Sequence, residues 1–148
     1  MARMVTCAIV AAVFAATLLQ PVHSGAGEGF VVVVNQTNPL DRLGRTELSK
    51  LFLKRTVAWP RGVAAAPCDL SGTSPTRKAF SQSVHGKPLW VIVAFWQQEI
   101  ASGRSLPPVV CSSEQAALQA VRDNPGGVAY VSESLPLGQG VKALILEP

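Results

Sequence analysis

Apolar and polar residues alternate along this chain with two different periods, one typical of buried strands and one of helices. The unbroken run from Phe30 to Val34 is typical of a strand buried on both faces, and it ends at the turn-forming cluster 35–39. Leu48, Leu51 and Phe52 instead follow the i, i+3, i+4 spacing of an amphipathic helix, with Thr46 as its expected N-cap. The chain therefore mixes strands and helices from its first ordered segments onward.

The rest of the chain continues this alternation. Further strands are expected at 63–67, 107–111, 128–131 and 141–146, and further helices at 75–84, 87–103 and 112–124, the last capped by Ser112 or Ser113. The apolar run that begins at Lys87 also suits a strand, but its apolar positions continue at helical spacing, so we interpret it as a helix that ends at Gly103. Strands that alternate with helices predict a doubly wound, parallel α/β sheet.

The N-terminal segment has the pattern of an export signal. A charged start, residues 1–4, precedes an apolar run at 5–19, which is shorter than the roughly 20 residues of a membrane-spanning helix. Small residues allow cleavage before Gly25 or before Gly27. We expect residues 1–26 to be removed and 27–148 to form one domain, periplasmic or secreted, without stable membrane insertion.

The charge of that domain limits which classes of partner it can bind. The sequence has 13 Lys and Arg against 9 Asp and Glu, and removal of Arg3 with the signal leaves 12 against 9. No run of Lys or Arg exceeds two residues, whereas nucleic-acid binding requires many clustered cations. A net charge of about +3 disfavours nucleic acid and suits a small anion.

Cysteine and histidine placement gives little support to metal or catalytic chemistry. Cys68 and Cys111 remain after signal removal, and they form either a disulfide in an oxidising compartment or two small buried apolar residues. Together with His85 they lack the close spacing of a metal site, and no glycine-rich nucleotide loop is present. Asp69, Ser71 and His85 lack the sequence pattern around a nucleophile that a catalytic triad needs. We expect no cofactor, no metal and no enzymatic activity.

The stretch CDLSGTSP, residues 68–75, is the strongest candidate for a binding site. It follows a predicted strand and precedes a predicted helix, where free backbone N–H groups favour an anion. Gly72 allows close approach, and Ser71, Thr73 and Ser74 supply hydroxyl donors. The same residues are also ordinary turn and N-cap residues, so the stretch alone leaves a plain turn as the alternative.

Two charged residues flank this stretch. Arg77 adds a charge-assisted hydrogen bond if its side chain folds back toward the loop. Asp69 repels a dianion unless it caps backbone N–H groups or accepts a hydrogen from a protonated ligand.

The stretch resembles the phosphate-site loop of periplasmic phosphate-binding proteins, Arg-x-Asp-Gly-Ser-Gly-Thr followed by a helix that carries Phe, here Phe80. Residues 51–53 with Trp59 and Gly62 look like that family's Ile-Phe-Leu-Gly, Trp and Gly, and residues 125–130 look like its Pro-Gly-Ala-Ile-Gly-Tyr. The resemblance spans nearly all of 30–146 and is greatest to short, single-lobe members.

This resemblance implies a single-lobe, doubly wound, mostly parallel sheet of the type II periplasmic-binding-protein kind. It implies that Ser71, Gly72 and Thr73 contact phosphate or a related oxyanion and that Asp69 matches the motif's Asp. It also implies a role in uptake or sensing, with an envelope transporter or sensor as partner. The chain departs from the pattern in three places: Pro67 replaces the motif's Arg, Leu70 a Gly, and Lys54 the Gly after the first helix.

An interaction module with a vestigial anion site is the alternative function. Trp59, Trp90 and Trp96 form either an exposed aromatic patch that anchors a partner or, as is commoner for aromatic residues on apolar faces, part of the core.

Overall fold

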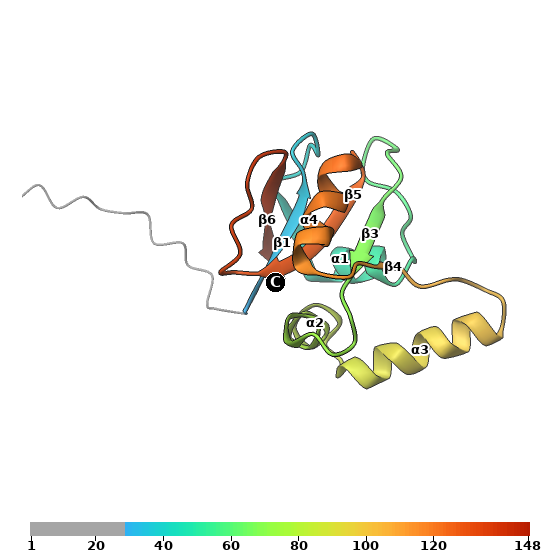
Figure 1. The fold of residues 1–148 in the computed structure, drawn as a ribbon. Coiled ribbons are helices and arrows are strands. Elements are labelled where there is room, and N and C mark those ends of the chain that lie inside the picture. Colours follow the sequence, from blue (N-terminus) through green and yellow to red (C-terminus); the bar gives the residue numbers. More distant parts are fainter. Residues whose placement is uncertain (1–28) are drawn as a thin grey trace, which may run out of the picture.

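The computed structural model describes residues 29–148, so the expected signal peptide lies outside the described residues. A mixed sheet with helices on its two faces makes up this part of the chain, with α4 in front of the sheet and α1 behind it in Figure 1. The strands are β1 (Phe30–Asn35), β2 (Arg42–Gly44), β3 (Ala66–Asp69), β4 (Val109–Val110), β5 (Gly127–Ser132) and β6 (Val141–Glu147). The helices are α1 (Arg45–Phe52), α2 (Pro75–Phe80), α3 (Leu89–Ala101) and α4 (Glu114–Asp123), and a π-helical turn, η1 (Ser81–His85), continues α2.

The sheet has the strand order β2-β6-β1-β5-β3-β4. β1 is antiparallel to both of its neighbours, β5 and β6, whereas the β2–β6, β3–β5 and β3–β4 pairs are parallel. Five strands therefore share one direction and β1 alone runs against them. The carboxyl ends of β3, β4 and β5 meet at one edge of the sheet, the place where ligands gather in folds of this class.

The core lies between the central strands and the helices on each face. Val32, Val33 and Val34 of β1 are buried, as the continuous β-branched run predicts for a central strand. Ala117, Leu118 and Val121 of α4 and Leu48, Leu51 and Phe52 of α1 supply the buried helix faces.

An aromatic cluster fixes α2 against the end of the sheet. Phe80 stacks on Tyr130 of β5, with ring centroids 3.8 Å apart and planes 9° apart. Phe30 and Phe52 contact both rings at their edges or at tilted angles. Because Phe80 ends α2, this packing sets the position of the loop that precedes the helix.

The structure confirms the predicted elements with several corrections of detail. The short strand β2 was not expected, and β3 lies two to three residues later than the predicted 63–67. Helix α1 begins at Arg45 with Gly44 as N-cap, so the prediction of Thr46 as cap was wrong. Ser113 caps α4 by accepting a hydrogen bond from the Ala116 amide at 3.0 Å.

Helix α3 lies apart from the sheet and projects beside the rest of the molecule, as Figure 1 shows. Only Ile92 and Trp96 of this helix are buried. Trp59 is also buried and donates its indole N–H to the Gly126 carbonyl at 2.9 Å, whereas Trp90 is 72% exposed. The three tryptophans therefore do not form one patch: two belong to the interior and one faces solvent. Within residues 29–148 no helix combines the length and apolar character needed to cross a bilayer.

Candidate functional site

The loop 70–74 joins β3 to α2 at the edge where β3, β4 and β5 end. Ser71, Gly72 and Thr73 form its exposed tip. The Ser74 amide donates to the Ser71 carbonyl at 2.9 Å, which closes a turn, and the Ser71 and Thr73 hydroxyls lie 3.0 Å apart. The three residues that the motif singles out are therefore adjacent and open to solvent.

The backbone of this tip keeps its donors available. No protein group within residues 29–148 accepts a hydrogen bond from the amides of Ser71 or Gly72, and the Thr73 amide has only a long 3.4 Å contact with the Ser71 hydroxyl. A Cβ added at Gly72 would meet no atom within 4 Å. Successive free amides carry partial positive charge and can bind an anion.

The base of the same loop is buried and fully paired. Asp69, the last residue of β3, is 7% exposed, and its Oδ1 accepts hydrogen bonds from the Leu70 amide at 2.9 Å and from the Tyr130 hydroxyl. Its Oδ2 lies 2.7 Å from the Arg77 guanidinium. The carboxylate thus caps a backbone amide, one of the two roles expected from the sequence.

The ionisation of this cluster reflects its burial. Burial raises the pKa of Asp69, and the Arg77 charge, the Tyr130 hydroxyl and the Leu70 amide oppose that rise. Burial, and then the Asp69 charge, raise the pKa of Tyr130, so its hydroxyl stays protonated and donates a hydrogen bond to Asp69.

Arg77 folds back toward the loop, but its charge is used inside the protein. Besides the ion pair with Asp69, it donates to the Leu70 carbonyl at 2.6 Å, and its side chain is 11% exposed. This guanidinium therefore bridges the two sides of the loop base.

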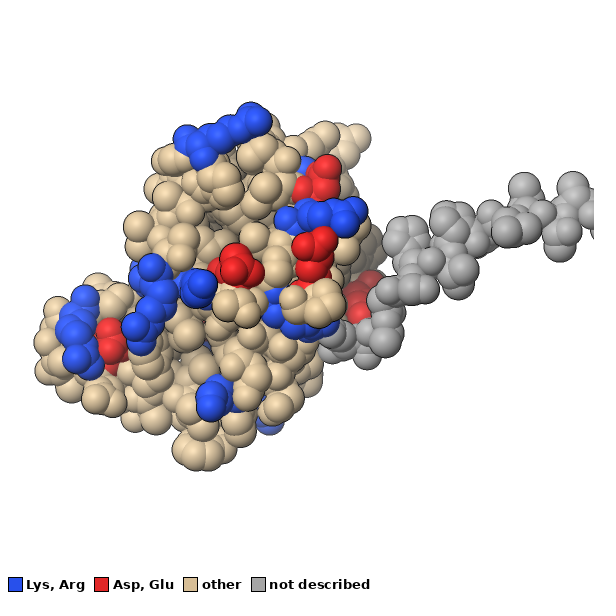
Figure 2. All heavy atoms as spheres, turned by 180° about the vertical axis from the view of Figure 1, so that it is seen from behind, with Lys and Arg blue, Asp and Glu red and all other residues tan. Residues whose placement is uncertain are grey.

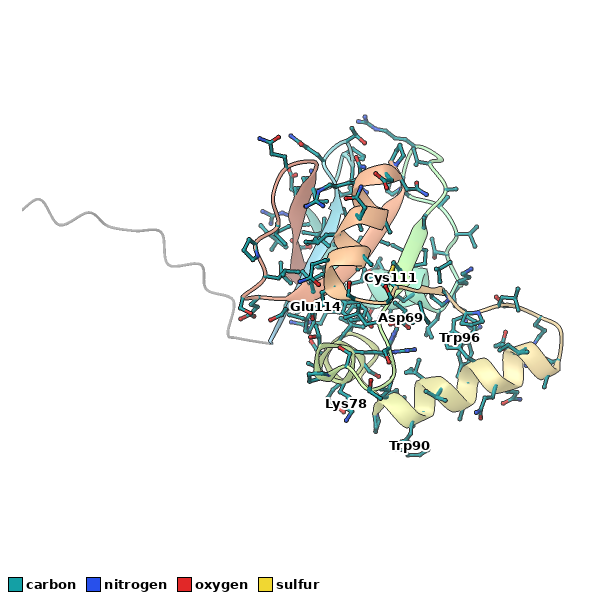
Figure 3. The ribbon with its side chains drawn as sticks, viewed as in Figure 1. Asp69, Lys78, Trp90, Trp96, Cys111 and Glu114 are labelled. Carbon is teal, nitrogen blue, oxygen red and sulfur yellow. A yellow bond between two sulfur atoms is a disulfide. The ribbon has the colours of Figure 1, made fainter. Side chains whose placement is uncertain are left out.

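A disulfide joins the same base to the neighbouring strand. Cys68 of β3 and Cys111, just after β4, are bonded with Cα atoms 6.0 Å apart, which settles the alternative left open by the sequence. The Cys111 amide also donates to the Asp69 carbonyl at 2.8 Å. Figure 3 shows Asp69, Cys111 and Glu114 gathered between the edge of the sheet and α2.

The start of α2 is held by its own cap and by α4. Ser74 caps the helix: its hydroxyl oxygen accepts a hydrogen bond from the Arg77 amide at 3.3 Å. Thr76 donates to the Glu114 carboxylate of α4 at 2.6 Å. Of the six residues expected at the site, the structure therefore leaves Ser71, Gly72 and Thr73 available at the tip and uses Asp69, Ser74 and Arg77 to hold the loop.

His85, at the end of η1, lies in this supporting layer. Its Nδ1 is 2.8 Å from the Ser49 hydroxyl of α1, and its ring packs edge-on against Phe80. Burial, and to a smaller extent the Arg77 charge, lower the pKa of His85 from 6.5 to about 4. The imidazole is therefore neutral at pH 7 and lies outside the loop.

The sequence analysis did not select Lys78 or Tyr130 as site residues. Lys78 is exposed, makes no ion pair within residues 29–148, and lines an open groove between α2 and α3 that begins at Gly72. Its position directly after Arg77 was visible in the sequence, but which of the two cations faces solvent was not. Tyr130 appeared only as a landmark of the resemblance, 61 residues from Asp69.

Charges elsewhere add no second candidate. On the face seen in Figure 2, Lys and Arg are interspersed with Asp and Glu among many uncharged residues. Among residues 29–148, no group of three or more His, Cys, Asp or Glu side chains is placed to hold a metal ion.

The fold of this chain is similar to that of three solved structures. The chain superimposes on an ABC-type phosphate transport receptor from Vibrio cholerae with a TM-score of 0.61 and 21% identity, over 80% of this chain and 46% of the receptor. A putative phosphate ABC transporter substrate-binding protein with bound phosphate from Clostridium perfringens gives a TM-score of 0.62 at 16% identity, over 80% and 44%. The chain has the fold of the periplasmic phosphate-binding proteins.

A possible phosphate binding protein from Planctomyces limnophilus shows the same likeness, with a TM-score of 0.58 and 18% identity over 80% of this chain and 41% of that one. The chain thus covers less than half the length of each of the three proteins. No family model and no curated protein matches the sequence.

Proposed function

We propose that this protein is an exported solute-binding domain that binds phosphate or a related oxyanion at the loop tip Ser71–Gly72–Thr73, in phosphate uptake or sensing. It performs no chemistry on the anion. An envelope transporter or sensor is the proposed protein partner.

The free backbone amides of the tip are the main observation that supports this proposal. Ser71 and Gly72 retain free N–H groups, Thr73 nearly so, and two hydroxyls lie beside them. The fold is shared with proteins described as phosphate receptors, one of them with phosphate bound. Free amides and hydroxyls at the carboxyl edge of a sheet favour negative charge, which supports an anion at this loop.

The electrostatics of the tip imply modest affinity. Arg77 is committed to Asp69, and Lys78 is the cation nearest in sequence that has no ion pair in the described part of the chain. The tip is exposed, so solvent weakens each ionic contact several-fold relative to a closed cleft. We expect phosphate to bind in the millimolar to high micromolar range, roughly the strength of a few hydrogen bonds to a charged group.

Calorimetric titration with phosphate and with sulfate tests the proposal. Thr73→Asp places a negative charge among the donors and should abolish binding, because Thr73 is exposed and bonded only to Ser71. Thr56→Asp, at another exposed threonine on the α1–β3 loop, is the matched control and should bind as the unmodified chain does. No heat with the unmodified chain at millimolar anion, or equal binding by Thr73→Asp, would contradict the proposal.

The interaction-module alternative is supported by a different observation, the exposed side chain of Trp90 on α3. In that case the loop tip would bind no anion, and substitutions on α3 rather than on the loop would abolish function.

A further inference from the structure

An open groove lies between α2 with η1 on one side and α3 on the other, and Gly72 of the loop tip is part of its lining. Lys78 and Gln82 line the side of α2 and η1, and residues of the range 88–97 line the opposite side. We call this space the α2–α3 groove. Its volume is about 610 Å³, which is within the range of pockets that hold small organic ligands.

The wall that α3 contributes is mostly apolar. Trp90, Val93 and Gln97 recur at intervals of three and four residues, so one face of the helix lines the groove. Trp90 is 72% exposed and Val93 is 38% exposed, so the described part of the chain leaves this wall largely uncovered. Figure 3 shows Lys78 and Trp90 at the lower side of the molecule, on neighbouring helices. An indole ring this exposed offers a flat surface on which an aromatic group can stack.

The charges of the groove favour an anion. Lys78 is the one charged side chain among the described residues that line it, and it makes no ion pair within residues 29–148. The free amide of Gly72 belongs to the same lining and adds a partial positive charge. None of the described residues of the lining is an Asp or a Glu, so no carboxylate there repels a negative group. The complementary ligand is therefore anionic at one end and apolar at the other.

Inorganic phosphate alone uses only a small part of this groove. An anion at Gly72 and Lys78 leaves the exposed surfaces of Trp90 and Val93 in contact with water. Burial of apolar surface is favourable in proportion to its area, so an organic substituent that covers this wall adds affinity. A phosphate monoester or a phosphonate keeps its terminal oxygens for the tip, because the substituent is attached on the opposite side of the phosphorus atom.

We propose that the α2–α3 groove selects soluble organophosphates, namely phosphate monoesters or phosphonates that carry an apolar and preferably aromatic substituent. The substituent lies against Trp90, and the anionic group is held by the Lys78 ammonium and the Gly72 amide. This inference rests on the proposed function, because the anionic group binds at the same loop tip. Inorganic phosphate is then the weaker ligand, by at least about tenfold relative to a phosphate that carries a phenyl ring.

Calorimetric titration of the chain expressed from its full sequence tests this selectivity with inorganic phosphate, methyl phosphate and phenyl phosphate. Phenyl phosphate should bind at least about tenfold more tightly than inorganic phosphate. Methyl phosphate should bind with nearly the affinity of inorganic phosphate, because a methyl group covers little of the apolar wall. Phenol, which has the ring without the anionic group, should give no measurable heat.

Variants of α3 separate the two parts of the ligand. Trp90→Ala should remove the advantage of phenyl phosphate and leave the affinity for inorganic phosphate unchanged, because the Trp90 ring is exposed and outside the core. Trp90→Phe keeps an aromatic ring and should retain most of the advantage. Ile100→Ala, at an exposed position of the same helix that does not line the groove, is the matched control and should change neither affinity. Lys78→Gln should weaken the binding of both ligands.

Failure of this inference and failure of the proposed function give different results. Equal affinities for inorganic phosphate and phenyl phosphate, or an advantage that Trp90→Ala leaves intact, would overturn the inference and leave the anion site at the tip. Binding of phenol as tight as that of phenyl phosphate would also overturn it. No heat with any of the ligands would contradict both. Binding of phenyl phosphate alone, lost in Trp90→Ala, would support the inference and reject inorganic phosphate as the ligand.

A phosphate monoester is also the headgroup of phosphatidic acid, so co-sedimentation with lipid vesicles distinguishes a soluble ligand from a membrane. The chain should stay in the supernatant with vesicles of phosphatidylcholine that contain phosphatidic acid. Co-sedimentation that Trp90→Ala abolishes would overturn the assignment to a soluble organophosphate and assign the groove to a lipid surface.

Discussion

The base and the tip of the loop after β3 are adjacent in sequence but are built in opposite ways. At the base, Asp69 and Arg77 are paired with each other and with Tyr130 and Leu70, beside a disulfide. At the tip, Ser71, Gly72 and Thr73 are exposed and keep backbone donors free. The structure therefore separates residues that hold the loop from residues whose backbone donors face solvent.

This contrast teaches that charge near a candidate anion site need not serve the anion. From the sequence, Arg77 was expected to fold back and add a charge-assisted hydrogen bond at the loop, yet its guanidinium fixes the loop base. Substitutions at the base should therefore affect folding first and binding second. Substitutions at the tip should do the reverse.

Removal of the disulfide should cause the largest loss of stability. Cys68 and Cys111 are 43 residues apart, and closure of a loop of that length in the unfolded chain is worth about 4 kcal/mol. Urea unfolding of a chain with Cys68→Ala and Cys111→Ala should show a loss of that order. Reduction of the unmodified chain is the control and should give a similar loss. A change below about 1 kcal/mol would show that the base is held without the bond.

Removal of the buried Arg77 charge should cause the second largest loss of stability. Arg77→Gln leaves the Asp69 carboxylate buried without its ion pair and should cost about 3 kcal/mol. Lys78→Gln, one residue further and exposed, should change stability by less than about 0.5 kcal/mol while weakening anion binding. Equal effects of the two substitutions on thermal unfolding would remove the distinction between the buried and the exposed cation.

Acidification should destabilise the supporting layer through His85. The folded-state pKa is lowered from 6.5 to about 4, so the unfolded chain binds a proton more readily between these values. Stability is fully present above pH 6.5 and falls as the pH drops toward 4, by about 3 kcal/mol from this group. His85→Gln should flatten the difference between unfolding free energies at pH 7 and pH 4.5. An unchanged pH dependence in that variant would assign the effect to other groups.

The smallest effect on stability is expected at the tip itself. A methyl group at Gly72 meets no atom within 4 Å, so Gly72→Ala should leave stability unchanged or raise it by about 0.5 kcal/mol. Anion binding should weaken, because the methyl group occupies part of the open surface. Gly126→Ala is the contrasting control: its Cβ would lie 1.8 Å from the Ala64 carbonyl oxygen, so that variant should be strongly destabilised. A destabilised Gly72→Ala would show that the tip is part of the packing.

Most elements of the fold could be predicted because their apolar spacing is strong. The Val-rich β1 and the amphipathic faces of α1 and α4 match the expected elements within one or two residues. The strand β2 has only three residues and no buried ones, so its pairing with β6 depends on a partner about 100 residues away. The direction of β1 is likewise a property of pairing, not of its own sequence.

The sequence could indicate the tip as a candidate site, but it could not indicate the contacts that hold the base. The tip depends on residue types within one local motif, whereas the base depends on contacts between β3, α2 and β5. Whether Cys68 reaches Cys111, and whether Arg77 or Lys78 turns inward, is decided by distances that only the folded chain has. Trp90 and Trp96 show the same limit, because six residues on one helix separate an exposed ring from a buried one.

The position of β1 also has a consequence for how the chain acquires its structure. Its two neighbours, β5 and β6, come from the last 22 residues, so the central pairs of the sheet join the beginning of the described chain to its end. Contacts this distant in sequence form late and slowly. A chain that passes through a narrow channel with its N-terminus first therefore cannot complete its core until almost all of it has emerged.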